Sequence, residues 1–253
     1  MEDIILQKLR EIEEKEDVRI LYAVESGSRA WGFESQDSDW DVRFVYAHPR
    51  DWYLSIEERR DVIELPISDS LDINGWDIRK ALQLYKKTNP PFYEWLQSPI
   101  VYIERGDFAQ KLRELMLQFY SPYSCLQHYL HMAKGNYKAY LGKEKVQLKK
   151  YFYVLRPVLA CFWIEEKGTM PPTEFEKLLE FRELQIDLRK EIYGLLERKK
   201  SEAELGEEEP ITAIDKFLEE SMAHFEQTAP PKRISTADVE ILDRVFREQI
   251  AFK

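Results

Sequence analysis

The sequence predicts an α+β protein in two parts. Helices and strands alternate in the first part, which ends at about residue 105, and only helices are expected in the second. In the first part, short apolar and β-branched runs bounded by turn residues alternate with stretches of helical periodicity. From Phe108 onward nearly every segment carries the helical period, and no convincing strand occurs. This change in character predicts one domain over residues 1–105 and a helical domain over residues 106–253.

The composition limits the classes of protein to which the chain can belong. An apolar fraction of 44% supports a folded core, and a formal charge of −10 argues against a protein that coats DNA or RNA through a basic surface. A nucleotide bound in a local basic pocket is compatible with that charge. Cys125 and Cys161 lie far apart and are expected to be buried free thiols. Because there is no apolar run of about 18 residues and no signal-peptide core, we expect a cytoplasmic protein with no membrane contact.

The first part begins with an amphipathic helix over residues 2–16, in which apolar residues recur at helical spacing among charges. Strands are expected at residues 18–24, 42–46, 61–67, 71–73 and 99–103. Short helices are expected at residues 29–33 and 52–60, and another short helix is expected to contain Trp95 and Leu96. Gly75 is expected to end the strand that precedes it. Asp77 is placed to cap the amino terminus of a further helix over residues 78–87.

The second part is expected to consist of helices separated by proline, glycine and acidic breaks. These helices are predicted at residues 107–119, 123–141, 144–167, 173–180, 184–200, 211–226 and 236–250. The acidic segment at residues 202–210 is expected to be a solvated loop between two of them.

The stretch from Glu25 to Asp41 contains the residues with the clearest chemical potential. Asp39 and Asp41 are two residues apart, so on an extended chain their side chains point to the same side. Two carboxylates at such a short distance repel each other unless a cation lies between them. Mg²⁺ prefers oxygen ligands of this kind. Gly27 and Ser28 form a tight turn whose backbone N–H groups can face an anion. The stretch therefore predicts a site for a divalent cation beside an anionic group.

A third carboxylate for this site is expected on a neighbouring strand. Asp72 is the best candidate, because Leu71 and Ile73 on either side of it anchor the strand in the core while its own side chain faces the other way. A carboxylate in that position lowers stability unless it is paired or bound to a metal. The alternative is a strand-end aspartate that faces water.

These motifs resemble a known superfamily. Gly27-Ser28, followed by Asp39-x-Asp41 and by Asp72 downstream, is similar to the signature of the DNA polymerase β-like nucleotidyltransferases. The stretches GSRAWGFES, NGWDIRKAL and KKYFYVLRP, at residues 27–35, 74–82 and 149–157, resemble a narrower group of bacterial and phage nucleotidyltransferases, some of which accompany RNA ligases. The resemblance implies a small mixed sheet with flanking helices, followed by an all-helical carboxy-terminal domain.

The resemblance also implies roles for individual residues. Asp39, Asp41 and Asp72 would be the catalytic carboxylates and would coordinate two Mg²⁺ ions. Gly27 and Ser28 would contact the β- and γ-phosphates of a nucleoside triphosphate. Asp72 would also be able to accept the proton of the attacking hydroxyl.

Several basic residues are further candidates for binding phosphate. Arg29 lies beside the Gly-Ser turn and can neutralise phosphate or form a simple ion pair. Lys149, Tyr153 and Arg156 are spaced four and three residues apart, which predicts one stripe on a helix. With Lys150 they would suit a triphosphate or an RNA end.

Arg43 is on the same strand face as Asp41, and it has the same two options as Arg29. It can neutralise phosphate, or it can pair with the neighbouring carboxylates.

The sequence thus favours a Mg²⁺-dependent nucleotidyltransferase that transfers a nucleoside monophosphate to an acceptor hydroxyl in a cleft between the two domains. The acceptor is expected to be an RNA end, a small molecule or a protein. The alternatives are a nucleotide-binding protein without turnover and an antitoxin-like partner protein. Three carboxylates gathered in one place favour the enzyme, because a protein released from catalysis has no need of them.

Overall fold

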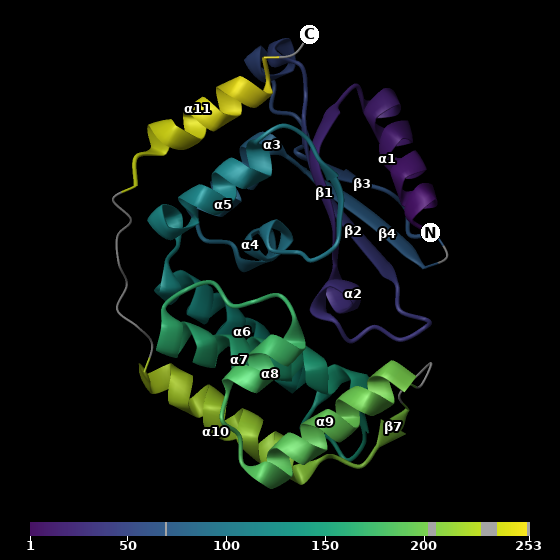
Figure 1. The fold of residues 1–253 in the computed structure, drawn as a ribbon, viewed down its shortest axis with the longest axis vertical. Coiled ribbons are helices and arrows are strands. Elements are labelled where there is room, and N and C mark those ends of the chain that lie inside the picture. Colours follow the sequence, from purple (N-terminus) through teal and green to yellow (C-terminus); the bar gives the residue numbers. More distant parts are fainter. Residues whose placement is uncertain (69, 202–205, 229–236, 252–253) are drawn as a thin grey trace. The chain divides into compact units, whose positions relative to one another are not determined.

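The structure, a computed structural model, describes residues 1–68, 70–201, 206–228 and 237–251 (Figure 1). The chain divides into two compact units. The first, here called the sheet unit, consists of Met1–Ala30, Asp39–Tyr120 and Ser235–Lys253. The second, the helical unit, consists of Trp31–Ser38 and Ser121–Ile234.

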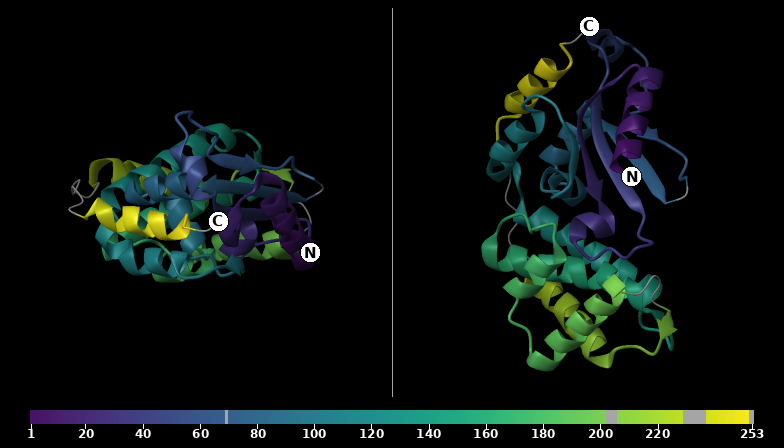
Figure 2. Two further views of the ribbon diagram at one scale, coloured as in Figure 1. Left: turned by 90° about the horizontal axis from the view of Figure 1, so that it is seen from above. Right: turned by 45° about the vertical axis from the view of Figure 1, so that its right-hand side comes forward.

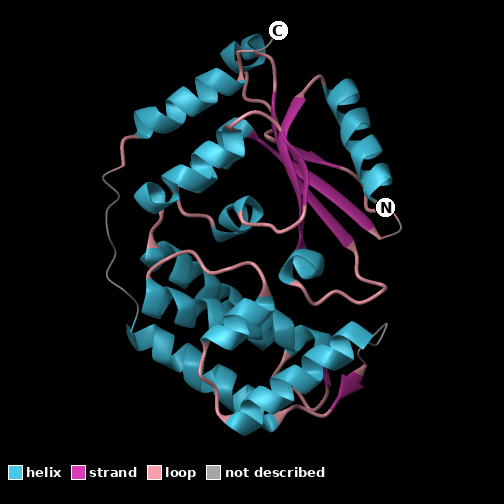
Figure 3. Ribbon diagram, in the orientation of Figure 1, coloured by secondary structure: helices cyan, strands magenta, loops and turns pink. Residues whose placement is uncertain are grey.

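The sheet unit is built on a β-sheet, whose strands are magenta in Figure 3. The sheet has five strands in the order β3-β4-β2-β1-β5. The strands are β1 (Arg19–Ser26), β2 (Trp40–Ala47), β3 (Val62–Glu64), β4 (Leu71–Asp77) and β5 (Val101–Glu104). β2 and β4 run parallel, whereas the other neighbouring pairs are antiparallel. The sheet is therefore mixed, and the prediction of an α+β fold with a small mixed sheet is confirmed.

Helices cover both faces of this sheet. The helices of the sheet unit are α1 (Glu2–Glu16), α2 (Gly27–Trp31), the 3₁₀ helix η1 (Arg50–Leu54), α3 (Ile78–Lys86), α4 (Pro90–Leu96), α5 (Phe108–Phe119) and α11 (Val239–Gln249). α1 packs on one face, and α3, α4 and α5 pack on the other (Figures 1 and 2). α1 presents Ile5, Leu9 and Ile12 to a core that includes Val42 and Phe44 of β2, as its apolar spacing predicted.

Gly75 lies inside β4, so the prediction that it ends this strand is wrong. A Cβ atom at Gly75 would lie 2.2 Å from Cε2 of Phe44 on the neighbouring strand. The glycine is required by close packing between two strands and not by a turn. β4 continues to Asp77, whose carboxylate accepts a hydrogen bond of 2.8 Å from the backbone N–H of Arg79 and caps α3 as expected.

The predicted domain boundary after residue 105 differs from the division that the structure shows. α5 follows that boundary but belongs to the sheet unit, where the carbonyl of Leu112 accepts a hydrogen bond of 2.6 Å from the hydroxyl of Tyr85. α11 also belongs to the sheet unit and packs against α3 and α5. There the guanidinium of Arg79 lies 5.0 Å from the ring centre of Tyr53 and 5.4 Å from that of Phe246.

The helical unit consists mainly of helices, with one small ladder of two strands. Its elements are α6 (Pro122–Tyr140), β6 (Val146–Gln147), the 3₁₀ helix η2 (Leu148–Tyr151), α7 (Phe152–Lys167), α8 (Phe175–Phe181), α9 (Ile186–Ser201), β7 (Glu207–Glu208) and α10 (Thr212–Thr228). β6 and β7 pair antiparallel, so the prediction of an all-helical second part is wrong at these residues. The helix predicted over residues 144–167 begins only at Phe152. Residues 202–205 of the predicted acidic loop lie outside the described residues.

α7 is the central helix of the helical unit and is buried around most of its surface. Cys161 on α7 and Cys125 on α6 are both buried and free, as predicted. Burial raises the pKa of the Cys161 thiol well above its ordinary value. Phe33, from the segment between α2 and β2, packs in the same unit with its ring centre 4.9 Å from that of Phe152. In the described part of the chain, no helix is both long and apolar enough to cross a membrane.

Candidate active site

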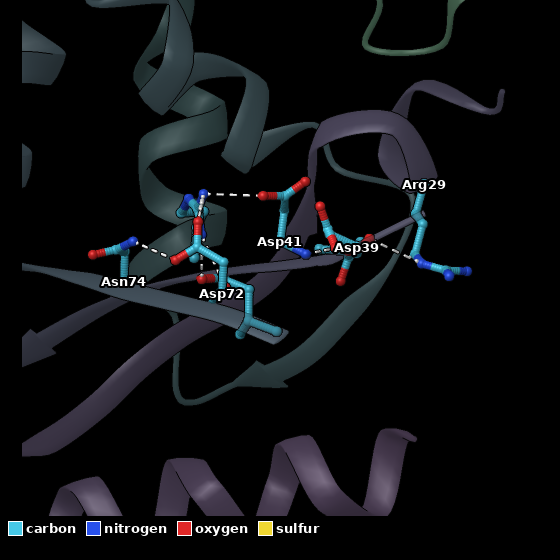
Figure 4. Close-up of polar contacts among 8 residues, drawn as sticks. Arg29, Asp39, Asp41, Asp72 and Asn74 are labelled. Carbon is cyan, nitrogen blue, oxygen red and sulfur yellow. Dashed lines mark hydrogen bonds and ion pairs between the residues drawn. The ribbon is translucent and has the colours of Figure 1, made fainter. Parts of the chain in front are cut away.

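The candidate site lies where the parallel strands β2 and β4 begin. In their register Asp41 is the direct partner of Asp72, and Figure 4 shows the two side chains near each other. Neighbouring strands lie about 4.8 Å apart, so this register brings the two carboxylates together although 31 positions separate them in the chain. The strand that was expected to carry a third carboxylate is therefore adjacent to the strand of Asp41.

The alternation of side chains along β2 and β4 explains why these polar groups share one face. Val42 and Phe44 point into the core beneath α1, so Asp41 and Arg43 point to the opposite face. Asp72 alternates with the buried Leu71 and Ile73 in the same way. Its side chain is only 22% exposed, which excludes the alternative of an aspartate that simply faces water.

The guanidinium of Arg43 lies between the two carboxylates. Its Nη2 atom donates to Oδ2 of Asp72 at 2.7 Å and to Oδ1 of Asp41 at 3.2 Å. Its Nη1 atom donates to the backbone carbonyls of Val42 and Asp72, both at 3.0 Å. The amide of Asn74 donates to Oδ1 of Asp72 at 2.7 Å, so both carboxylate oxygens of Asp72 accept a hydrogen bond (Figure 4).

The pKa of Asp41 is raised above its ordinary value, and burial is the largest cause. The positive charge of Arg43 lowers this pKa, whereas the negative charges of Asp72 and Asp39 raise it further. The site thus carries more negative charge than a single guanidinium neutralises. A further cation would relieve that repulsion.

Gly27 packs directly against Asp41. Its φ angle is +60°, and a Cβ atom built on it would lie 2.0 Å from Oδ2 of Asp41. No other residue type fits there without moving the aspartate. Ser28 follows on the short helix α2, so the predicted Gly-Ser turn and the second aspartate of the Asp39-x-Asp41 motif form one packed unit.

Asp39 lies outside β2, immediately before its first residue, Trp40, and it is exposed. Arg29 on α2 donates from Nε to the backbone carbonyl of Asp39 at 3.2 Å (Figure 4). The guanidinium of Arg29 also lies 3.8 Å from the ring centre of Trp40. Arg29 thereby ties α2 to the start of β2, and the phosphate-binding role implied for it stays a prediction.

Within the described ranges of the chain, no three histidine, cysteine, aspartate or glutamate side chains form a group that could hold a metal ion. Arg43 supplies the positive charge between Asp41 and Asp72. The donor set nevertheless fits a hard divalent cation, because it consists of carboxylate oxygens brought together by paired strands. The metal-binding roles of Asp39, Asp41 and Asp72 stay predictions.

Glu25, at the end of β1, is a site residue that sequence reasoning missed. Its side chain is fully buried, and Oε1 accepts a hydrogen bond of 2.8 Å from the backbone N–H of Asp41. Oε2 accepts one of 2.5 Å from the hydroxyl of Tyr102, and Ser98 donates to the Glu25 carbonyl at 2.6 Å. Burial is the main reason why the pKa of Glu25 is raised. A glutamate directly after five apolar strand residues, at 20–24, was the signal available in the sequence.

The nucleotide-binding candidates Lys149, Lys150 and Tyr153 all lie in the helical unit. The predicted stripe is interrupted, because Lys149 and Lys150 belong to η2 whereas Tyr153 belongs to α7. The ammonium of Lys150 lies 4.3 Å from the ring centre of Tyr140 and 4.7 Å from that of Tyr153. Arg156 is 3% exposed and donates to the carbonyl of Thr173, which makes it a core residue of this unit. The nucleotide-binding roles of the other three stay predictions.

Lys199 is a second residue that the sequence did not indicate. From α9 it donates to the hydroxyl of Ser35 at 3.0 Å, across 164 positions of the chain. Burial lowers the pKa of Lys199, and the positive charge of Lys149 lowers it further. Lys199, which binds Ser35 in the segment before Asp39, is therefore exposed to the positive charge of Lys149.

Three comparisons with known proteins place the chain among its relatives. The sequence model of the RNA repair pathway DNA polymerase β family matches residues 1–248. A protein of Bacillus subtilis (strain 168), named uncharacterized protein YcgL, is 48% identical over 239 residues, which are 94% of this chain and 92% of the relative.

The third comparison is with the crystal structure of a nucleotidyltransferase-like protein from Exiguobacterium sibiricum 255-15. The alignment covers 96% of this chain and 79% of that chain at 14% identity, with a TM-score of 0.31 that supports no argument. The family match spans nearly the whole chain, as does the relative that is 48% identical, and the match agrees with the Gly27-Ser28 and Asp39-x-Asp41 motifs. The chain therefore belongs to the RNA repair pathway DNA polymerase β family.

Proposed function

We propose that the protein is a nucleotidyltransferase that transfers a nucleoside monophosphate from a nucleoside triphosphate to an acceptor hydroxyl. The observation that carries this proposal is the register of Asp41 with Asp72, together with Gly27 packed against Asp41. The arrangement gathers negative charge at one end of two parallel strands, next to the turn that the family resemblance assigns to phosphate. Membership of an RNA repair family supports the same reaction class.

In the proposed reaction the acceptor hydroxyl oxygen forms a bond to the α-phosphorus of the triphosphate. The bond from that phosphorus to the oxygen bridging to the β-phosphorus breaks, and pyrophosphate leaves. The hydroxyl proton passes to Asp72 or to water. Such a transfer needs little covalent chemistry from the protein, so positioning and control of charge account for most of the acceleration.

Asp39, Asp41 and Asp72 are the residues proposed to hold two Mg²⁺ ions. Bound there, the ions would neutralise charge on the triphosphate and lower the pKa of the attacking hydroxyl. The carboxylate oxygens of these residues suit a hard cation, and the raised pKa of Asp41 reflects a site in which negative charge is in excess.

Gly27 and Ser28 are proposed to contact the β- and γ-phosphates, and Arg29 is proposed to neutralise phosphate beside them. Lys149, Lys150 and Tyr153 are proposed to bind the nucleotide from the helical unit. The positive charge of Lys149, which lowers the pKa of Lys199, supports an affinity for anions in that unit, because an anion bound there would offset this charge.

The acceptor is proposed to be the end of an RNA. The family description supports RNA, and the formal charge of −10 favours contact with a short stretch near the end over binding along a long strand. Small-molecule and protein hydroxyls are the other acceptors that the assay has to include.

The proposal is tested with each of the four labelled nucleoside triphosphates, Mg²⁺ and RNAs that carry free terminal hydroxyls. The wild type is expected to label RNA and release pyrophosphate. Asp41→Asn and Asp72→Asn are expected to lower the rate by roughly 100-fold or more, because each removes a charge that the transition state requires. Asp51→Asn, at an exposed carboxylate of η1 in the same unit, is the matched control and is expected to keep the wild-type rate. Absence of transfer to every acceptor, or full activity in Asp41→Asn, would reject the proposal.

A nucleotide-binding protein without turnover is the second candidate, and Arg43 is the observation that favours it. The guanidinium already neutralises part of the charge of Asp41 and Asp72, as a protein without metal chemistry would require. Calorimetric titration with Mg²⁺ and each triphosphate, with turnover assayed in the same sample, separates the two candidates. Tight binding with no pyrophosphate released would favour the second.

A further inference from the structure

Arg43 makes an unusual set of contacts for a residue in a proposed metal site. Its side chain is 19% exposed, and its guanidinium donates to four oxygens. Two of these belong to the carboxylates of Asp41 and Asp72, and two are backbone carbonyls of β2 and β4. The planar, five-donor guanidinium suits such a set of acceptors, whereas an ammonium would not reach all of them.

The position of this guanidinium corresponds to the place where a divalent cation would be most strongly attracted. Asp41 and Asp72 lie on paired strands, and each contributes an oxygen to the same Nη2 atom. The negative charge of Asp39 also acts on Asp41 and raises its pKa. A cation that binds Asp41 and Asp72 together and the guanidinium of Arg43 therefore compete for the same oxygens.

The four hydrogen bonds of Arg43 differ in length, and this difference allows such a competition. Three of its hydrogen bonds, to Oδ2 and the carbonyl of Asp72 and to the carbonyl of Val42, measure 2.7 to 3.0 Å. The contact with Asp41 is the longest of the four, at 3.2 Å. Arg43 can therefore release Asp41 while it remains attached to the main chain of both strands.

We propose that Arg43 is a built-in counter-ion that holds the place of a divalent cation between Asp41 and Asp72 and must release Asp41 before the cation binds. This inference rests on the proposed function, since it assumes that the two carboxylates bind a divalent ion. It accounts for the guanidinium that occupies the space between the carboxylates of Asp41 and Asp72. It also makes Arg43 a positioning residue, because it sets the spacing of the carboxylates when no ion is bound.

The test compares divalent-ion binding in the full-length wild type and in Arg43→Met, which keeps the length of the side chain but removes its charge and its donors. Binding of Mn²⁺ is measured by electron paramagnetic resonance without nucleotide. Thermal unfolding is measured with and without MgCl₂, with ionic strength matched by KCl. Arg60→Met is the matched control, since Arg60 is an exposed arginine of the same unit that pairs with Glu64.

Arg43→Met is expected to bind Mn²⁺ about fivefold or more tightly than the wild type, because the competing cation is gone. It is also expected to unfold at a lower temperature without divalent ions and to show a larger rise in unfolding temperature on addition of MgCl₂. Arg43→Lys, which keeps the charge but loses the fork of donors, is expected to lie between the two. In the double variant that carries both Arg43→Met and Asp41→Asn, the gain in Mn²⁺ affinity is expected to be lost.

Unchanged or weaker Mn²⁺ binding in Arg43→Met would overturn the inference. It would mean instead that Arg43 holds the carboxylates in the positions that ion binding requires. If Arg43→Met fails to fold, the comparison is made with Arg43→Lys, and equal or weaker binding in that variant overturns the inference as well. Nucleotide transfer by the wild type, with no gain in binding by the variants, would reject this inference and leave the proposed function intact. Absence of transfer, together with absence of Mn²⁺ binding in every variant, would reject both.

Discussion

At the scale of single residues, the candidate site depends on how Asp41 is held. Gly27 lies against one of its carboxylate oxygens, Glu25 accepts a hydrogen bond from its backbone N–H, and Arg43 contacts the other carboxylate oxygen. These three contacts come from β1, from the first residue of α2 and from β2 itself. The position of Asp41 is therefore set by its neighbours on every side, as a preorganised site requires.

Replacing Gly27 by alanine tests the close approach to Asp41. Gly27→Ala introduces a Cβ atom at a φ of +60° and 2.0 Å from Oδ2 of Asp41, so we expect a loss of about 1–2 kcal/mol of unfolding free energy from the backbone and an additional loss from the displaced aspartate. The rate of nucleotide transfer is also expected to fall, because the aspartate is displaced. Urea unfolding and the labelled-nucleotide assay measure the two effects.

Gly106→Ala is the matched control for that substitution. Gly106 lies in the same unit at a φ of +61°, and a Cβ atom there meets nothing within 4 Å. It is expected to lose the backbone contribution of about 1–2 kcal/mol alone and to keep the wild-type transfer rate. Equal loss of stability and of activity in both variants would contradict the proposed contact between Gly27 and Asp41.

At the scale of elements, β4 links the candidate site to the helix α3. Its first residues carry Asp72, and its last residue, Asp77, caps α3. The carboxylate of Asp77 is 1% exposed and also accepts a hydrogen bond of 2.7 Å from the hydroxyl of Tyr53. Burial is the main reason why the pKa of Asp77 is raised, and its hydrogen bonds with Tyr53 and Arg79 act in the opposite direction.

Asp77→Ala is expected to destabilise the protein by about 2–4 kcal/mol, since it removes a helix cap and leaves a buried hydroxyl without its acceptor. Asp238→Ala is the matched control. Asp238 caps α11 through a hydrogen bond of 3.0 Å from Glu240 N–H, but it is exposed, so only about 1 kcal/mol is expected to be lost. Chemical denaturation of both variants measures the difference, and equal losses would mean that the Tyr53 contact adds nothing.

At the scale of the whole molecule, the two units are interleaved along the chain. The chain leaves the sheet unit at Trp31, re-enters it at Asp39 and leaves it again at Ser121, and α11 belongs once more to the sheet unit. Helices from both ends of the sequence thus belong to one unit, with α1 packed on the sheet and α11 packed on α3 and α5. A fragment that ends at residue 105 lacks α5 and α11, which pack on this unit.

Phe246→Ala tests how firmly α11 belongs to the sheet unit. The Phe246 ring lies 5.0 Å from that of Tyr53 and 5.4 Å from the guanidinium of Arg79, so its loss is expected to destabilise the docked helix by about 2 kcal/mol. Hydrogen exchange is expected to rise in α11 and in the facing α3 but not in α7. Leu117→Ala, on α5 at a side chain that is 80% exposed, is the control and is expected to leave exchange unchanged. Unchanged exchange in α11 of Phe246→Ala would show that the aromatic contacts do not hold the helix.

Much of the fold was predictable because it depends on local patterns. The apolar spacing of α1, the cap at Asp77 and the strands around the Asp39-x-Asp41 motif follow from residues close together in the sequence. The prediction that Gly75 ends its strand was wrong, because a glycine is needed there to make room for the ring of Phe44 on another strand. The helix predicted from residue 144 failed at β6, whose partner β7 follows some 60 residues later.

The α+β class, the Gly-Ser motif, the pair of aspartates and a third aspartate on a nearby strand could all be inferred from the sequence, because period and motif are local properties of a chain. The tertiary structure alone decided that Arg43 lies between Asp41 and Asp72 and that Glu25 holds the backbone of Asp41. Those contacts depend on the register of strands and on which face each side chain takes. Register and pairing are set by packing across the sheet, which no single stretch of sequence contains.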